Sequence, residues 1–257
     1  DHYKAVSAWP RLGLSMMVAL AGLLFALQYV TLAKFAVLPP GAGFVQWSEF
    51  WERVAAEVPL DSGDALLGLA VITMCTALLW SQWRYGELTR LLVWVTASEA
   101  RALVGLGIVS ACSVRYYFAP GQLAWGGDAA EHILYVKITS EAFAAWEWPI
   151  WTNRLAGGSP FLQFYGFLFF YLVAAVDQIC GDVFTSIKIV GGIAHALSGP
   201  TMYLVVRIAT RSRLAGIVAG LAYVLCFWHA QQIAIMGRWP LSLFYLLLPM
   251  PFYGFEL

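Results

Sequence analysis

The run FTSIKIVGGIAHALSGPTMYLVV, from Phe184 to Val206, is apolar over a length that can cross a bilayer, which takes about 20 residues. His195 stands inside it, between Gly191-Gly192 and Gly199-Pro200. Small residues of this kind let membrane helices approach one another closely. The run therefore predicts a transmembrane helix, with His195 packed against a neighbouring helix.

Similar runs recur along the whole chain, which is 61% hydrophobic and only 12% charged. Soluble domains carry about 25% charged residues, so this composition is typical of a protein in lipid. A spanning chain must satisfy its backbone polar groups internally, which favours helices. We therefore predict an all-α, polytopic integral membrane protein. The formal net charge is +0 and no basic patch is present, so we expect membrane lipid and no nucleic acid as a partner.

The apolar runs predict about six or seven transmembrane helices, with amphipathic interfacial helices between them. The segment 47–58 shows an apolar face at helical spacing, and two further non-spanning helices are expected at 88–97 and 128–148. The expected spans are Leu12–Leu38, Ala65–Trp83, Ala102–Phe118, Pro160–Val176, Phe184–Val206, a sixth from Leu214 to near Trp228, and a seventh from Pro240.

Three regions follow from this pattern. Residues 1–118 hold the N-terminal spans, 119–160 form a loop with juxtamembrane helices, and 161–257 hold C-terminal spans that we expect to be cut from a longer protein. Short loops rich in Lys and Arg stay in the cytoplasm, and the first-half charges place the 119–160 loop outside. Strict alternation then puts the basic residues of 207–213 outside as well. Either the fourth span does not cross fully, or the span count is off by one.

The loop contains a polar cluster at the start of a predicted helix. Asp128, Glu131 and His132 stand at positions i, i+3 and i+4, so they project from one side of one turn. One interpretation is structural, with Asp128 as the N-cap and Glu131 completing a capping box. The other is functional, with a divalent cation at Asp128 and Glu131, and Asp128 and His132 as catalytic residues.

Aromatic and basic residues follow in the same loop. Trp148 and Trp151 either form an aromatic belt at the membrane surface or line a sugar site, because indole faces suit the C–H surfaces of sugars. Arg154 either binds a phosphate or reaches the interface as a snorkelling cation. Gly157-Gly158-Ser159-Pro160 predicts a turn, with Pro160 at the first position of the next helix.

The order of these motifs resembles that of a known superfamily. The chain presents GGDAAEH, WEWPIW, GGSPFLQFYGFLFFYL, HALSGPTMYLVVRIATRSRLAGIVAGLAYVL and IMGRWPLSLFYLLLP in turn. This order is similar to that of the GT-C-type membrane glycosyltransferases. The nearest kin look like bacterial multi-span proteins described as YfhO-like or as related to 6-pyruvoyl-tetrahydropterin synthase. The resemblance covers roughly Ala119 to Leu257.

The resemblance implies a GT-C-like fold in the bacterial inner membrane and sugar transfer from a polyprenyl-phosphate donor. Asp128 matches the acidic residue that opens the first large extracytoplasmic loop of that superfamily, where it is taken as the base or a metal ligand. His132 and Arg154, with a divalent cation at Asp128 and Glu131, would then stabilise the departing phosphate. Trp148 or Trp151 would line the sugar site.

Two other functions are compatible with the sequence. The second acidic residue of the superfamily is missing at Gly237-Arg238-Trp239-Pro240, and the chain has no Asp-Asp or Glu-Asp pair. A non-catalytic accessory subunit of a larger membrane complex would keep the scaffold without the chemistry. A transporter is the third possibility, with His195 as its intramembrane ionisable group.

Overall fold

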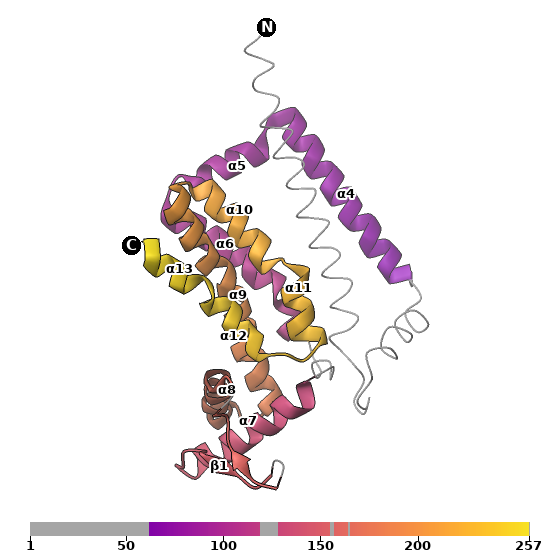
Figure 1. Ribbon diagram of the computed structural model, residues 1–257. Coiled ribbons are helices and arrows are strands. Elements are labelled where there is room, and N and C mark those ends of the chain that lie inside the picture. Colours follow the sequence, from indigo (N-terminus) through magenta and orange to yellow (C-terminus); the bar gives the residue numbers. More distant parts are fainter. Residues whose placement is uncertain (1–61, 119–127, 155–156, 164, 257) are drawn as a thin grey trace.

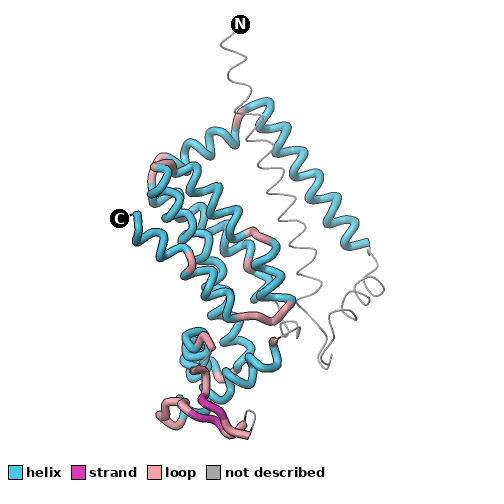
Figure 2. The backbone as a smooth tube through the Cα atoms, viewed as in Figure 1, coloured by secondary structure: helices cyan, strands magenta, loops and turns pink. Residues whose placement is uncertain are grey.

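The computed structural model describes residues 62–118, 128–154, 157–163 and 165–256. Over these ranges the chain is mostly helical, which confirms the predicted helical class. Figure 2 shows helices throughout the body of the molecule and one small pair of strands at its lower end. The predicted first span, Leu12–Leu38, and the predicted interfacial helix at 47–58 lie outside the described residues.

The first described helices form a bent unit. The α4 helix (Ser62–Tyr85) covers the predicted second span, and α5 (Glu87–Thr96) is the predicted short helix after it. The α6 helix (Glu99–Ser113) starts where Ser98 Oγ accepts a hydrogen bond from the backbone N–H of Arg101 at 3.2 Å, and it is followed by the 3₁₀ helix η1 (Arg115–Phe118). The axes of α5 and α6 make a bend of 119°.

The predicted loop contains α7 (Ala129–Ala144) and an antiparallel pair of strands, β1 (Trp151–Thr152) and β2 (Ser159–Pro160). Pro160 pairs with Trp151, so the prediction that it starts a helix is wrong. The next helix, α8 (Phe167–Cys180), has 14 residues and a length of about 21 Å. That length falls short of the roughly 30 Å hydrocarbon core. The predicted fourth span is therefore too short to cross by itself.

The longest helix is α9 (Val183–Thr210), which contains the predicted fifth span. Asp182 caps it by accepting from the N–H of Thr185 at 2.7 Å, and Ser212 caps α10 (Arg213–Val224) in the same way. The chain continues through α11 (Phe227–Ala230) and a π-helical turn, η2 (Gln231–Ile235). It ends in α12 (Pro240–Leu247), with Pro240 at the start of the helix, and α13 (Pro249–Glu256).

Six or seven spans were predicted, and the described residues contain fewer. Two helices are long and apolar enough to cross a membrane, Val183–Thr210 and the segment Arg213–Ile233, and a third results if the bent α5–α6 pair is counted as one span. Part of the difference arises because the predicted first span lies outside the described residues. Another part has a physical cause: the predicted fourth span is shortened by β2, and the predicted seventh is divided into two eight-residue helices.

The α9 helix is the centre of the arrangement, and α6, α8, α10, α12 and α13 all pack against it. At 28 residues it is about 42 Å long, close to the thickness of a bilayer with its headgroup layers. Its N-terminal end lies near α7 and α8, and its C-terminal end lies near the junction of α5 and α6 (Figure 1).

A charged network fixes the C-terminal end of α9. The carboxylate of Glu99, at the start of α6, accepts hydrogen bonds from Tyr203 Oη at 2.9 Å and from Arg213 Nε at 2.7 Å. Arg213 Nη1 also donates to the carbonyl of Thr96 at 3.1 Å. The basic residues of 207–213 therefore lie at the same end of the molecule as Arg101.

Two glycines set the contact between α9 and α10. A Cβ atom built on Gly220 would lie 2.7 Å from the carbonyl oxygen of Gly199 and 2.7 Å from Leu106 Cδ2 of α6. A Cβ atom on Gly199 would lie 2.8 Å from Ser110 Oγ and 3.1 Å from the carbonyl oxygen of Gly220. Real Cβ atoms essentially never lie within 3.0 Å of a backbone atom, so the Gly220 contact excludes a side chain, and the 3.1 Å contact of Gly199 is tighter than almost all real ones. The three helices can therefore approach this closely only because neither glycine has a side chain.

We expect Gly220→Ala to destabilise the protein by about 1–3 kcal/mol, because the added methyl group forces α9 and α10 apart. The matched control is Gly107→Ala in α6, where nothing lies within 4 Å of the added atom. Both changes bring the same gain in helix propensity, so the control should be neutral or stabilising. Thermal unfolding of the purified proteins in detergent measures the difference. Equal melting temperatures for the two variants would contradict the packing argument.

Candidate functional site

A cavity of about 450 Å³ lies where the start of α7, the start of α8 and the α12 helix meet. Its polar lining comes from Asp128, His132, Tyr165 and Arg238, and Gly166 completes the approach to α8. The remaining wall is apolar and comes from α8 and the α12 region, with Leu168, Phe169, Pro240, Leu241, Leu243, Phe244 and Leu247. We call it the Asp128 cavity. It combines a charged mouth with a surface suited to a hydrocarbon chain.

Asp128 occupies the N-cap position of α7, but its side chain does not cap the helix. Its Oδ2 instead accepts a hydrogen bond from Arg238 Nε at 3.1 Å, and both side chains are 42% exposed. Glu131 turns away to accept the hydroxyl of Tyr135. The predicted capping box is therefore wrong, because each carboxylate has a stronger partner than the free N–H groups of the helix.

Arg238 is held in place by the turn that carries it. Its Nη1 donates to Gln232 Oε1 at 2.8 Å, and its backbone N–H donates to the carbonyl of Gln232 at 3.1 Å. The neighbouring Gly237 has a φ of +66°, a left-handed conformation that suits glycine. The backbone N–H of Asp128 donates to the Met236 carbonyl at 3.3 Å. These bonds place a guanidinium, a bidentate phosphate-binding group, at the cavity mouth.

His132 is buried beneath the ion pair and has both ring nitrogens in use. Nδ1 lies 2.8 Å from the carbonyl oxygen of Gly237, which can only accept, so Nδ1 carries the proton. Nε2 then accepts from the hydroxyl of Tyr165 at 2.8 Å. Burial lowers the pKa of His132, and the Gly237 carbonyl and the Asp128 carboxylate oppose that effect. His132 is therefore neutral near pH 7 and orients Tyr165.

Tyr165 presents its ring and hydroxyl to the Asp128 cavity. Burial, with the nearby Asp128 and Glu131 carboxylates, raises the pKa of Tyr165, so the phenol keeps its proton. The Tyr165 ring lies 5.8 Å from Phe170 and 5.7 Å from Tyr135, measured between centroids. This aromatic packing fixes the hydroxyl beside the charged mouth.

A metal ion does not fit this donor set. Among residues 62–118, 128–154, 157–163 and 165–256, no three His, Cys, Asp or Glu side chains gather as a metal-binding group. Asp128 faces a guanidinium, which repels a cation, and Glu131 is engaged by Tyr135. The geometry therefore disfavours the predicted divalent cation at Asp128 and Glu131.

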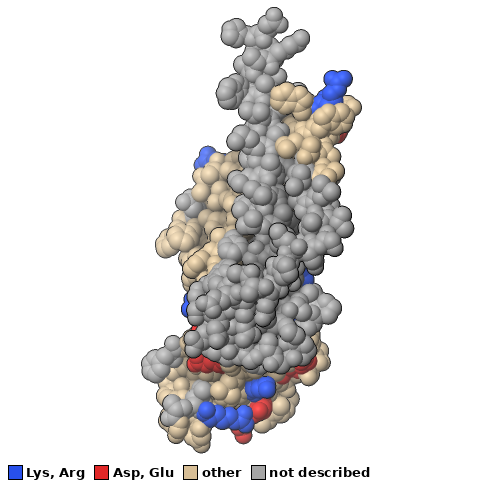
Figure 3. Space-filling view, turned by 90° about the vertical axis from the view of Figure 1, so that its right-hand side faces the viewer, with Lys and Arg blue, Asp and Glu red and all other residues tan. Residues whose placement is uncertain are grey.

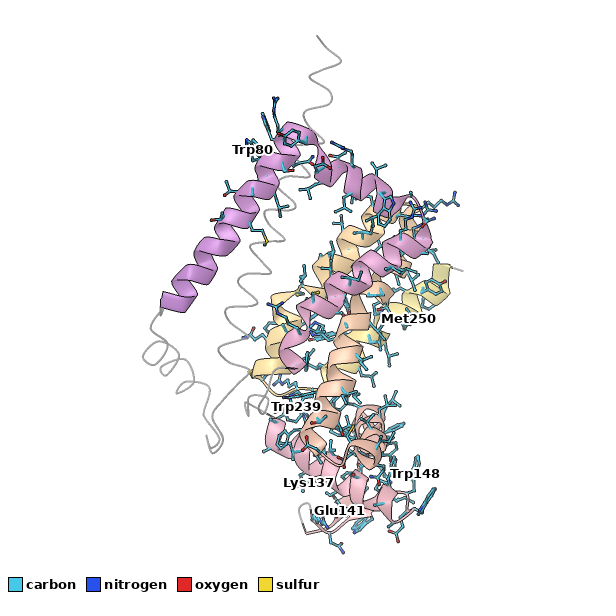
Figure 4. All side chains as sticks on the ribbon, turned by 180° about the vertical axis from the view of Figure 1, so that it is seen from behind. Trp80, Lys137, Glu141, Trp148, Trp239 and Met250 are labelled. Carbon is cyan, nitrogen blue, oxygen red and sulfur yellow. The ribbon has the colours of Figure 1, made fainter. Side chains whose placement is uncertain are left out.

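The other predicted site residues lie at the opposite end of α7, about 20 Å along the helix from Asp128. Figure 4 shows Glu141 and Trp148 together at that end, away from Trp239, whose ring lies 6.1 Å from His132. Arg154 Nη2 lies 2.6 Å from Glu141 Oε2, and this pairing lowers the pKa of Glu141. Arg154 is therefore not at the Asp128 cavity.

The tryptophans of this end pack on their own neighbours. Trp148 stacks on Phe143, with centroids 5.9 Å apart, and meets the edge of Tyr171 at 4.9 Å. Trp151 Nε1 donates to Asn153 Oδ1 at 2.9 Å. Both rings are more than half exposed, as expected for an aromatic belt. Their predicted role in sugar binding stays a prediction.

The structure thus brings together Asp128 and His132 and adds Arg238 and Tyr165, which sequence reasoning did not assign to the site. The signal for Arg238 is a lone cation between two apolar runs, preceded by Gly237 and followed by Trp239-Pro240. No family model, no curated protein and no solved structure matches this chain.

Lowering the pH should destabilise the protein through His132. Its folded pKa lies below the unfolded value of about 6.5, so the unfolded chain binds the proton first as the pH falls. The contribution of His132 to the free energy of unfolding is therefore fully present above about pH 6.5. Below that pH it declines, by at most about 1.4 kcal/mol per pH unit. We expect His132→Gln to show a shallower decline in thermal unfolding between pH 7 and pH 5.

Tyr165→Phe is the control for this measurement, because it removes the hydroxyl but leaves the imidazole buried. It should keep the decline of the unsubstituted protein. A His132→Gln variant with an unchanged pH profile would show that His132 does not titrate in this window.

Proposed function

We propose that this protein is a GT-C-type membrane glycosyltransferase that moves a sugar from a polyprenyl-phosphate donor to an acceptor hydroxyl. The observation that carries the proposal is the Asp128 cavity, where a carboxylate and a guanidinium meet a wall of leucine and phenylalanine. A lipid-linked sugar has the same division into a charged head and a hydrocarbon chain. The resemblance to GT-C enzymes supports the same substrate class, with Asp128 at the matching position.

In this proposal Asp128 is the general base. Its carboxylate takes the proton of the acceptor hydroxyl while that oxygen attacks the anomeric carbon, and the bond from this carbon to the phosphate oxygen breaks. The bonding electrons leave with the polyprenyl phosphate, whose charge Arg238 stabilises. His132 does not transfer a proton here, since its Nδ1–H is given to Gly237 and its Nε2 accepts from Tyr165. It positions Tyr165, which faces the sugar.

We infer the orientation of the protein from its two ends. The end where α5, α6 and α9 meet is rich in arginine, which favours the cytoplasmic side. The Asp128 cavity and α7 then face the extracytoplasmic side, as the first-half charges predict. Donors linked to polyprenyl phosphate reach such a cavity from the membrane, along the exposed apolar side chains Leu168, Phe244 and Leu247.

We expect Asp128→Asn to reduce sugar transfer by about 10²–10⁴-fold, the usual contribution of a general base. Asparagine keeps the shape and can still accept from Arg238, so the protein should stay folded. Glu131→Gln is the matched control, because Glu131 lies one turn away and engages Tyr135 instead of the cavity. The assay follows labelled sugar from a panel of polyprenyl-phosphate sugars, with the folded protein quantified in parallel. Transfer that survives Asp128→Asn would falsify the role of Asp128.

Arg238→Gln should weaken transfer at low donor concentration far more than Arg154→Gln. Arg238 lies at the cavity mouth, whereas Arg154 is paired with Glu141 at the other end of α7. Losing a charge-assisted bond to phosphate typically costs about 1.5–3 kcal/mol, or roughly 10–150-fold in donor affinity. The KM for the donor measures the effect. A larger effect for Arg154→Gln would show that the phosphate binds at Arg154, as the sequence predicted, and not at Arg238.

An accessory subunit without catalytic activity is the second candidate. Two observations favour this role. Asp128 is paired with Arg238, and among the described residues that line the cavity Asp128 is the one that carries a carboxylate. Binding separates the two functions: the purified unsubstituted protein should retain a polyprenyl-phosphate sugar if it is the enzyme. If neither binding nor transfer is found for any donor tested, the accessory role is the better account.

A further inference from the structure

The two ends of the molecule carry opposite charge. The segments 84–101 and 207–213 contain six arginines and two glutamates, a net charge of +4, with the arginines at positions Arg84, Arg90, Arg101, Arg207, Arg211 and Arg213. Residues 128–188, together with Arg238, which pairs with Asp128, contain six acidic and four basic side chains, a net charge of −2. We call the first of these the arginine end. Figure 3 shows a basic group at the upper end of the molecule and mixed charges at the lower end.

The helix α5 crosses the arginine end and connects the top of α4 to the start of α6 (Figure 1). None of its residues is fully buried, and it turns by 119° into α6 instead of continuing into the bundle. Leu91, Val93 and Trp94 are each more than half exposed. A short amphipathic helix at such a bend is suited to the plane of the membrane surface.

Aromatic rings accompany these charges. Trp80 and Trp83, in the last turns of α4, are 61% and 70% exposed, and Tyr85 packs edge-on against Trp80 at 5.8 Å. The guanidinium carbon of Arg101 lies 4.9 Å from the ring centroid of Trp94. Indole and phenol rings beside cations are typical of the boundary between lipid and water. The side chains of this end therefore match a headgroup layer more closely than bulk water or hydrocarbon.

Charge is left over at this end after internal pairing. Glu87 pairs with Arg90 at 2.9 Å, and Glu99 is shared by Arg207 and Arg213. Arg84 and Arg211 form no ion pair with any described residue, and both are exposed. Arg211 is the C-cap residue of α9, in the connection to α10, and has a φ of +55°.

We propose that the arginine end is a binding surface for anionic phospholipids, with α5 lying in the headgroup layer of one leaflet. The occupants are phospholipids with a net negative headgroup, one held by Arg84 at one end of α5 and another by Arg211 at the other, because α5 is about 15 Å long. The charge of +4 opposite a negative surface is the complementarity that selects this partner. This inference depends on the membrane placement of α9 and not on the proposed glycosyltransferase activity, so either can fail without the other.

The test uses the intact protein in phosphatidylcholine vesicles containing a spin-labelled phosphatidylglycerol probe. The unsubstituted protein should prefer this probe over spin-labelled phosphatidylcholine. In the double variant Arg84→Gln/Arg211→Gln, the preference for the anionic probe should fall about fivefold for each charge removed. Raising the salt concentration to 1 M should weaken the preference of the unsubstituted protein, because exposed charges are then screened within about 3 Å.

Two further variants separate lipid binding from folding and from total charge. Arg84→Lys/Arg211→Lys keeps the charge and should keep the preference. Lys137→Gln/Arg154→Gln removes two charges from the other end of the molecule and should also leave the preference unchanged. An unsubstituted protein with no preference for the anionic probe overturns the proposal. So does an equal loss in the two glutamine double variants, because it would show that total charge and not the arginine end matters.

Discussion

The contact between Gly199 of α9 and Gly220 of α10 is the constraint on which the rest of the structure depends. Two backbones that meet within Cβ distance leave no room for a side chain, and Leu106 of α6 closes the same contact from a third helix. This packing holds α9 at the centre of the molecule. Because α9 is about as long as a bilayer is thick, the Asp128 cavity and the arginine end are separated by the length of this helix.

Near the N-terminal end of α9 lie helices that are too short to cross a bilayer by themselves. The α8 helix starts late because Ser159 and Pro160 pair with β1, and the α12 helix ends after eight residues. Their apolar side chains and the first turn of α7 enclose the Asp128 cavity. The late start of α8 therefore has a structural consequence, because the segment before it supplies Tyr165 and Gly166 to the lining of the Asp128 cavity.

At the other end of α9, one carboxylate organises several cations. Glu99 accepts hydrogen bonds from Tyr203, Arg207 and Arg213. These bonds join the start of α6 to the end of α9 and the start of α10. The exposed side chains limit the energy of each ion pair to about 1 kcal/mol or less. The main consequence of the network is therefore positional. It holds two arginines beside the single carboxylate of Glu99, which leaves a net positive charge at this end.

The sequence by itself determined the helical class, the two long apolar segments predicted at 184–206 and from Leu214 to near Trp228, and the start of α12 at Pro240, because apolar length acts locally. It also identified Asp128 and His132 as neighbours on one turn. Only the tertiary structure decided their partners, since Arg238 meets Asp128 across 110 positions and displaces the capping interaction. The same holds for Arg154, which pairs with Glu141 on its own side of α7. Local pattern located most of the helices but not the start of α8, because Pro160 pairs with Trp151 instead. The partner of a side chain depends on all the groups that folding brings within hydrogen-bonding distance.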